Sequence, residues 1–139
     1  MRTSKVVFIC LGNSCRSIMA EALARHYFRE KVAAASAGIS PLGFVVPQTL
    51  EVLAEIGVSI AGLRSKGMEE IDFRACHLVV NLTDYPLKNL LPFTFPGRLL
   101  HWPVFDPYGG LLDDYRRTRD SLHRLITQEI DAAILSAGS

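Results

Sequence analysis

The chain has 139 residues, 49% of them apolar, and a formal net charge of +1. This length fits one domain over residues 1–139 with a buried core, and the small charge argues against a general nucleic-acid or membrane-surface binder. No segment approaches the ~18 apolar residues of a membrane helix, and the first apolar run carries no signal-peptide pattern, so we expect a cytoplasmic protein.

The predicted elements alternate between strands and helices, as judged from apolar runs, helical periodicity and Gly or Pro breakers. In chain order they are a strand over 5–10, a helix over 17–30, a strand over 32–37, a helix over 47–56, a short helix over 68–73, a strand over 76–82, a short helix over 86–91, a strand over 98–102 and a helix over 111–135.

This alternation predicts an α/β fold: a single domain with a four-stranded parallel sheet and helices on both faces. Ligands of such folds gather beyond the carboxyl ends of the strands. The segments 10–17 and 103–110 each follow a predicted strand. We therefore expect both segments at the same edge of the sheet.

The most informative stretch runs from Cys10 to Ser17, with the sequence Cys-Leu-Gly-Asn-Ser-Cys-Arg-Ser. It lies between the first strand and the first helix, where converging loop N–H groups and the positive helix end bind anions. Gly12 and Asn13 tolerate the positive φ that such a loop requires. The sequence therefore predicts a phosphate-binding loop after the first strand.

Two side chains of this loop suit covalent catalysis on an oxyanion. Cys10 lies among the loop amides, near a helix N-terminus and the guanidinium of Arg16, and all three stabilise a thiolate. Arg16 offers a planar fork that binds two oxygens at once. Ser17 begins the helix and is placed to donate a hydrogen bond to the Cys10 sulfur. Cys10 is the candidate nucleophile.

The loop contains no carboxylate, although cleavage of a phosphate ester by a thiolate requires a proton for the leaving alcohol. The candidate general acid is Asp106, which precedes Pro107 in the predicted loop 103–110. Proline restricts the preceding residue to extended backbone. An Asp-Pro pair is often only a turn, so the prediction depends on this loop lying opposite Cys10.

At these residues the chain resembles the low-molecular-weight protein tyrosine phosphatase family, whose signature C-x-G-N-x-C-R-S is matched from Cys10 to Ser17. The resemblance extends over the whole chain in length, element order and the late Asp-Pro pair. It implies hydrolysis of phosphotyrosine or aryl phosphate monoesters through a cysteinyl-phosphate. Cys10 would be the nucleophile, Asp106 the acid and then the base, and no metal or cofactor would be needed.

The resemblance also assigns supporting residues. Ser36 corresponds to a family serine that braces the loop asparagine, here Asn13, although a strand-end serine is the plain alternative. Cys15 is either a redox partner of Cys10 or a buried thiol. Tyr108 is a candidate wall of the slot for an aromatic substrate, although Gly109 follows it where many relatives carry a second tyrosine. The residues expected to bind substrate are Leu11, Gly12, Asn13, Ser14, Cys15 and Tyr108.

Arsenate reductases of the thioredoxin-coupled type share this fold and loop, so an arsenate reductase is the alternative. Ser65, Lys66 and Trp102 resemble that branch. Those reductases pass oxidation to extra cysteines just after the third strand, and residues 79–89 contain none. We therefore favour the phosphatase and retain a reductase with an external thiol donor as the alternative. A protein that only binds oxyanions would not need both a thiolate and an acid.

The expected partners are a phosphotyrosine-containing protein or a small aryl phosphate, with the phosphate held in the loop. Neither nucleic acid nor a membrane is expected. Three cysteines, an odd number, argue against a disulfide framework. Their spacing fits no common zinc pattern, and none of the four histidines has a metal-pair partner at helical spacing.

Overall fold

The computed structural model describes residues 3–86, 91 and 95–137. Within them, one sheet contains the strands in the order β2-β1-β3-β4. Their bounds are β1 (Ser4–Cys10), β2 (Val32–Gly38), β3 (Leu78–Asn81) and β4 (Arg98–His101). All three neighbouring pairs are parallel. The predicted four-stranded parallel sheet is confirmed.

The strand β1 lies between β2 and β3 because both of its faces are apolar. Val6 and Phe8 pack on one face of the sheet, and Val7 and Ile9 pack on the other. Such a continuous apolar run is typical of a central parallel strand. The chain therefore emerges from the middle of the sheet at Cys10.

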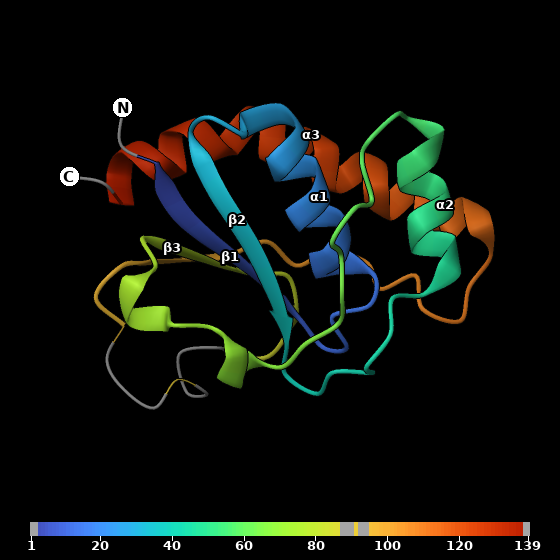
Figure 1. Ribbon diagram of the computed structural model, residues 1–139, viewed down its shortest axis with the longest axis horizontal. Coiled ribbons are helices and arrows are strands. Elements are labelled where there is room, and N and C mark those ends of the chain that lie inside the picture. The colour runs from blue at the N-terminus through green and yellow to red at the C-terminus, as the bar shows by residue number, and fades with distance from the viewer. Residues whose placement is uncertain (1–2, 87–90, 92–94, 138–139) are drawn as a thin grey trace.

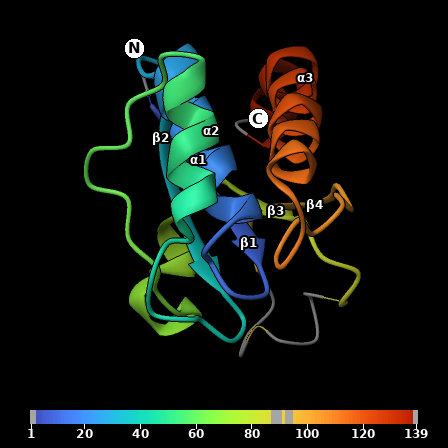
Figure 2. The same cartoon turned by 90° about the vertical axis from the view of Figure 1, so that its right-hand side faces the viewer.

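The α-helices of the described residues cover the same face of the sheet (Figures 1 and 2). They are α1 (Arg16–Phe28), α2 (Pro47–Glu55) and α3 (Leu112–Ala137), and they enclose the larger of two apolar clusters. The opposite face is covered by two 3-10 helices, η1 (Met68–Glu70) and η2 (Phe73–Ala75), over a smaller cluster. Helices on both faces are thus confirmed, and the helices described on the second face are short ones.

Several element bounds differ from the sequence prediction. The short helix expected over 68–73 is replaced by η1 and η2, which are separated by the extended Ile71. The strand expected from 76 begins at Leu78, since Cys76 ends η2 and donates its backbone N–H to Phe73. Residues 87–90 of the helix expected over 86–91 lie outside the described residues.

The carboxyl ends of the strands point away from the two chain termini (Figure 1). Segments 11–15, 39–46, 64–67 and 103–110 are linked by hydrogen bonds and an ion pair near Cys10, at the carboxyl end of β1. The sheet therefore brings four sequence-distant segments to one edge. Among the described helices, none has the length and apolarity to span a membrane.

Candidate active site

The loop between β1 and α1 has a tightly constrained backbone. Asn13 has φ +46°, the one positive φ among the described non-glycine residues. Gly38, paired with Cys10 across the sheet, touches the loop so closely that a Cβ there would lie 2.8 Å from the Leu11 carbonyl oxygen. Only glycine allows this approach. The backbone conformation of the loop thus depends both on its own residues and on the glycine at the end of β2.

The loop directs its carbonyl oxygens outward, toward the segment 39–49. Four of them accept backbone N–H groups at 2.8–3.2 Å: Cys10 from Ile39, Leu11 from Ser40, Gly12 from Leu42 and Ser14 from Val46. The Ser14 oxygen also accepts the Thr49 hydroxyl at 3.0 Å. No described residue accepts the amides of residues 12–15. The loop therefore has free N–H groups, as an anion site requires.

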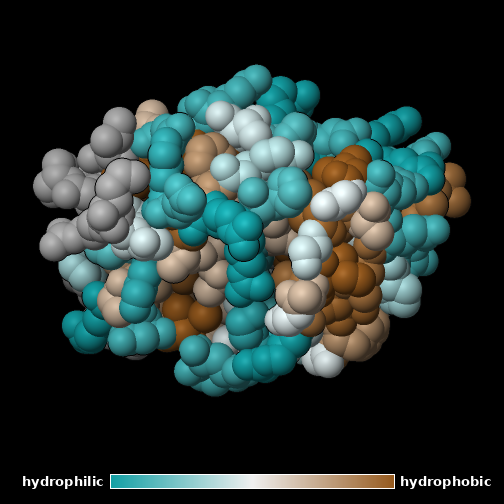
Figure 3. Space-filling view, turned by 45° about the horizontal axis from the view of Figure 1, so that its top comes forward, coloured by the Kyte–Doolittle hydropathy of each residue, from teal (hydrophilic) through white to brown (hydrophobic). Residues whose placement is uncertain are grey.

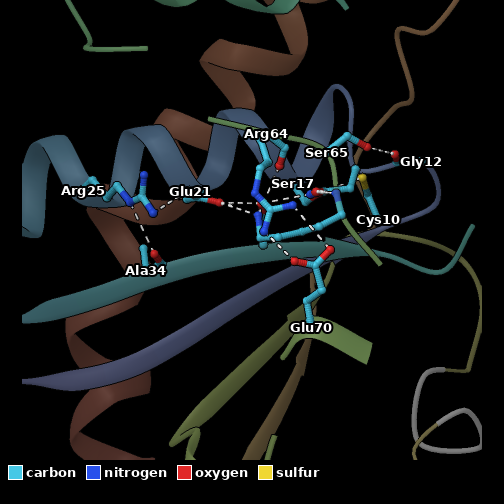
Figure 4. Close-up of polar contacts among 12 residues, drawn as sticks. Cys10, Gly12, Ser17, Glu21, Arg25, Ala34, Arg64, Ser65 and Glu70 are labelled. Atoms are coloured by element: carbon cyan, nitrogen blue, oxygen red, sulfur yellow. Dashed lines mark hydrogen bonds and ion pairs between the residues drawn. The ribbon is translucent and has the colours of Figure 1, made fainter. Parts of the chain in front are cut away.

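The sulfur of Cys10 lies at the base of this loop and forms a hydrogen bond with Ser17 Oγ at 2.9 Å (Figure 4). Ser17 is fully buried at the start of α1, and its oxygen accepts an N–H from Asn13 at 2.7 Å. Because this hydroxyl oxygen already accepts a hydrogen bond, its own hydrogen is available to the sulfur. A thiolate acceptor would make that bond stronger.

Arg16 joins the loop to the other side of the site. Its side chain is 9% exposed, and its Nη2 lies 3.4 Å from Asp106 Oδ2. Its Nη1 donates to the carbonyl oxygens of Leu82 at 3.1 Å and Val104 at 3.4 Å. The backbone after β3 and β4 thus fixes the guanidinium plane. The structure brings Arg16 and Asp106 together, although 90 positions separate them.

Asp106 is held by its own loop. Its Oδ1 accepts the backbone N–H of Tyr108 at 3.1 Å, and the preceding Phe105 carbonyl accepts the Thr118 hydroxyl of α3 at 3.0 Å. The Asp106 side chain is 43% exposed. A carboxyl group with this exposure can exchange protons with water and with a bound ligand.

These residues line one cavity of about 230 Å³. Its walls are Cys10, Leu11, Gly12, Ser14, Cys15, Arg16, Ser40, Leu42, Asp106 and Tyr108. Asn13, Ser17 and Ser36 are fully buried and are not among the wall residues. The structure thus gathers all the predicted site residues in the cavity or directly behind it.

Cys15 also lines the cavity. Burial raises the pKa of Cys15, while hydrogen bonds from Thr49 and Ser14 act in the opposite direction. Beneath the site, burial raises the pKa of Tyr115 to about 12. Cys15 and Tyr115 are therefore neutral at physiological pH. A neutral Cys15 places no second negative charge beside an anionic substrate.

Sequence reasoning missed the contribution of segment 64–67. The Ser65 hydroxyl donates to the Gly12 carbonyl at 3.1 Å, and the Lys66 backbone N–H donates to Asn13 Oδ1 at 2.8 Å. Ser65 and Lys66 entered the sequence analysis only as a family likeness. No local signal indicates contacts to a loop more than 50 positions earlier.

Glu21 was missed as well, although a signal exists. It is 1% exposed on α1, a helix in which all nine residues from Arg16 to Ala24 are buried. A carboxylate on a buried stretch of helix requires partners, and Glu21 lies four positions after Ser17. That spacing places the two side chains on one helix face.

The site suits an anion bound by a cation and by N–H groups, with a thiol sulfur at its base and a carboxyl group at its rim. Within the described residues, no group of three or more His, Cys, Asp or Glu side chains is arranged to hold a metal ion. Arg16 and the loop amides are the groups placed to stabilise the negative charge of a bound anion.

Comparison with known proteins agrees with this geometry. A family model described as low molecular weight phosphotyrosine protein phosphatase matches residues 5–134. The chain is 33% identical to a protein-arginine-phosphatase of Bacillus subtilis, over 88% of this chain and 92% of that protein. It is also 33% identical to arsenate reductase 2 of Staphylococcus saprophyticus, over 94% of this chain and 99% of that one. A solved structure of an arsenate reductase in the phosphate binding state superposes with a TM-score of 0.84 at 29% identity, over 94% and 99% of the two chains.

Proposed function

The chain belongs to the low molecular weight phosphotyrosine protein phosphatase family, and we propose that it hydrolyses aryl phosphate monoesters, including protein phosphotyrosine, through a cysteinyl-phosphate. The observation that carries the proposal is the meeting of Cys10, Arg16 and Asp106 around one cavity. A nucleophile, an oxyanion-binding cation and a proton donor are the three groups that this reaction needs.

In the first step the Cys10 thiolate attacks phosphorus in line with the ester oxygen. The S–P bond forms as the P–O bond breaks, and Asp106 gives its proton to the departing phenolate. Arg16 and the loop amides hold the three non-bridging oxygens, whose charge is spread in the transition state. Ser17 keeps its hydrogen bond to the sulfur throughout.

In the second step water attacks the phosphorus of the cysteinyl-phosphate. Asp106, now a carboxylate, accepts a proton from the water as the new P–O bond forms. The S–P bond breaks, and the electron pair returns to Cys10 as a thiolate that Ser17 stabilises. Phosphate then leaves, and the enzyme regains its starting protonation state.

Arsenate reduction is the second candidate, because several relatives are named arsenate reductases. Its net reaction converts arsenate and two thiols into arsenite, one disulfide and water. The chain has three cysteines. Cys76 precedes Leu78 by two positions, and Leu78 pairs with Val6 near the start of β1. Cys76 therefore lies at the end of the sheet away from Cys10. Only Cys15 could assist Cys10, so a reductase would depend on an external thiol.

The deciding assay uses purified protein with four substrates in parallel: p-nitrophenyl phosphate, a phosphotyrosine peptide, a phosphoarginine peptide, and arsenate with glutathione or thioredoxin. The phosphoarginine arm is included because one relative is named a protein-arginine-phosphatase. We expect turnover of the aryl phosphates and its complete loss in Cys10→Ser. Arsenate turnover without phosphate release would replace our proposal with the second candidate.

Asp106→Asn tests the acid. We expect phosphate to bind as in the wild type, while kcat falls about 10²- to 10⁴-fold for alkyl phosphates, whose leaving groups need a proton. p-Nitrophenyl phosphate, with its good leaving group, should lose less in the first step. Equal rates for wild type and variant on poor leaving groups would remove Asp106 from this role.

A further inference from the structure

The loop that carries Asp106 is exposed on both sides of that residue. Phe105 is 68% exposed and Tyr108 is 56% exposed, whereas Pro107 is buried. A loop with few buried apolar contacts opens readily in solution. A general acid, however, must lie within hydrogen-bond reach of the oxygen that it protonates. The position of Asp106 therefore depends on polar contacts of the loop as well as on apolar packing.

The contacts of Asp106 itself leave one backbone torsion to be fixed. Its Oδ1 accepts the Tyr108 N–H at 3.1 Å, and its Oδ2 lies 3.4 Å from Arg16 Nη2. Pro107 restricts the ψ of Asp106 to the extended region. The φ of Asp106 still changes when the peptide group between Phe105 and Asp106 rotates. A group that binds the Phe105 carbonyl oxygen limits that rotation, because this oxygen belongs to the same peptide group.

Thr118 of α3 binds this carbonyl oxygen. Its hydroxyl donates to Phe105 at 3.0 Å, and the residue is 1% exposed. Thr127 on the same helix shows the ordinary alternative, since its hydroxyl donates to the carbonyl of His123, four positions earlier, at 2.7 Å. A hydroxyl group has one hydrogen to donate. Thr118 therefore uses its hydrogen for the loop and not for its own helix.

We propose that Thr118 is a positioning residue for Asp106: its hydroxyl fixes the Phe105–Asp106 peptide group and so holds the Asp106 carboxyl group beside Arg16 at the rim of the cavity. The proposal deepens the proposed function and rests on it for its catalytic meaning. Thr118 is not among the residues that line the cavity, so its effect passes entirely through the loop.

Arg16 does not depend on this hydrogen bond. Its Nη1 donates to the carbonyl oxygens of Leu82 at 3.1 Å and Val104 at 3.4 Å, and the Val104 N–H donates to the Leu82 carbonyl at 3.3 Å. These contacts hold the guanidinium through the backbone after β3 and β4. Removal of the Thr118 hydroxyl should therefore disturb Asp106 while anion binding by Arg16 remains intact.

The test compares variants that differ in a single hydroxyl group. Thr118→Val removes the hydroxyl and keeps the branched shape, and Thr118→Ser keeps the hydroxyl. Thr127→Val is the matched control, the same substitution at an exposed threonine of the same helix. For each variant we would measure kcat on p-nitrophenyl phosphate and on an alkyl phosphate, the affinity for inorganic phosphate by isothermal titration, and the backbone amide NMR signals of residues 104–110.

We expect Thr118→Val to lower kcat on the alkyl phosphate by about three- to tenfold, the effect of losing one hydrogen bond. The loss on p-nitrophenyl phosphate should be smaller, because its leaving group needs less protonation. The amide signals of the loop should shift, and phosphate affinity should stay at the wild-type value. Thr118→Ser and Thr127→Val should match the wild type in every measurement.

A second comparison places Thr118→Val in the Asp106→Asn protein. There it should cause no further loss on the alkyl phosphate, because the group that Thr118 positions has already been removed. An additional loss in this background, or equal losses on both substrates in the single variant, would overturn the proposal in favour of a general structural role. If Thr118→Val fails to fold, Thr118→Ala compared with Thr118→Ser isolates the same hydroxyl.

Unchanged loop signals and unchanged kcat in a folded Thr118→Val would also overturn the proposal, since water would then replace the hydroxyl without effect. The NMR readout requires no turnover. Loop signals that shift in Thr118→Val, together with a wild-type protein that hydrolyses no phosphate ester, would support the role of Thr118 in holding Asp106 while the proposed function fails. Wild-type hydrolysis that Thr118→Val leaves unaffected would show the reverse.

Discussion

At the scale of single residues, Arg16 connects fold and chemistry. Its Nη1 donates hydrogen bonds to the carbonyl oxygens of Leu82 and Val104. Its Nη2 faces the carboxylate of Asp106. The plane is therefore fixed before any ligand arrives. A preorganised donor of this kind loses little entropy on binding an oxyanion.

Arg16→Lys should accordingly be more damaging than its conserved charge suggests. A lysine ammonium cannot bridge two ligand oxygens while also reaching both carbonyls. We expect phosphate affinity to fall by about tenfold to a hundredfold, the range for a lost charge-assisted hydrogen bond. Isothermal titration with phosphate measures this, and Arg117→Lys is the control on an exposed face. Equal affinities for wild type and Arg16→Lys would refute the bidentate role.

The cysteines should differ sharply in reactivity. Burial raises the pKa of Cys15 and of Cys76, so their thiolate fractions at pH 7 are below those of ordinary thiols. Cys10 has the Ser17 hydroxyl and the loop amides to stabilise its thiolate. We expect iodoacetamide at pH 7 to modify Cys10 first, with Cys15 following only at alkaline pH. Peptide mass mapping would contradict this if Cys15 or Cys76 were labelled before Cys10.

At the scale of elements, the short helix α2 depends on its contact with α3. Glu55, the last residue of α2, accepts hydrogen bonds from Arg116 and Arg119 at 2.6–3.1 Å. Arg119 also donates to the Val52 carbonyl, which lies in the last turn of this helix of nine residues, where carbonyl oxygens lose their ordinary partners within the helix. Since α2 follows the segment 39–46, which donates hydrogen bonds to the loop after β1, this contact helps to hold that segment in place.

This contact predicts an acid-sensitive contribution to stability. Hydrogen bonds from Arg116 and Arg119 lower the pKa of Glu55 from its ordinary value of 4.5. A lowered folded-state pKa means that the stabilisation is complete above pH 4.5 and is lost as pH falls further. In Glu55→Gln the melting temperature should therefore be lower than in the wild type at pH 7, and the two should converge toward pH 3. A constant difference over that range would contradict the assignment.

At the scale of the whole molecule, the candidate site and the main apolar core lie in different regions of the fold. The large apolar cluster lies between the sheet and the three α-helices, while the site lies beyond one strand end. On the surface, Figure 3 shows apolar patches separated by polar areas. Exposed large apolar residues also flank the site, among them Leu42, Phe44, Phe105 and Tyr108.

Because four segments converge on the oxyanion site, ligand binding should stabilise the entire fold. Phosphate bound only to the folded state adds about 2.7 kcal/mol at one hundred times its Kd. We expect a phosphate-dependent rise in melting temperature that is lost in Arg16→Ala and retained in Cys76→Ala. An equal rise in Arg16→Ala would place the stabilising phosphate elsewhere on the protein.

The sequence by itself determined the local features: a central apolar strand, the loop from Cys10 to Ser17, and the order of strands and helices. These depend on neighbours a few positions apart, so periodicity and residue type are sufficient. It also indicated Asp106, because strands of a parallel sheet end at a common edge. It did not separate short 3-10 helices from a single helix over 68–73, since three-residue turns leave little periodicity.

Only the tertiary structure decided which distant groups meet. The approach of Asp106 to Arg16, the contact of segment 64–67 with Asn13, and the hydrogen bond from Ser36 to Glu21 join residues 15 to 90 positions apart. Such contacts depend on the register of the strands and on how α1 packs against β2. Those are fixed by the packing of the whole core, which no local pattern encodes.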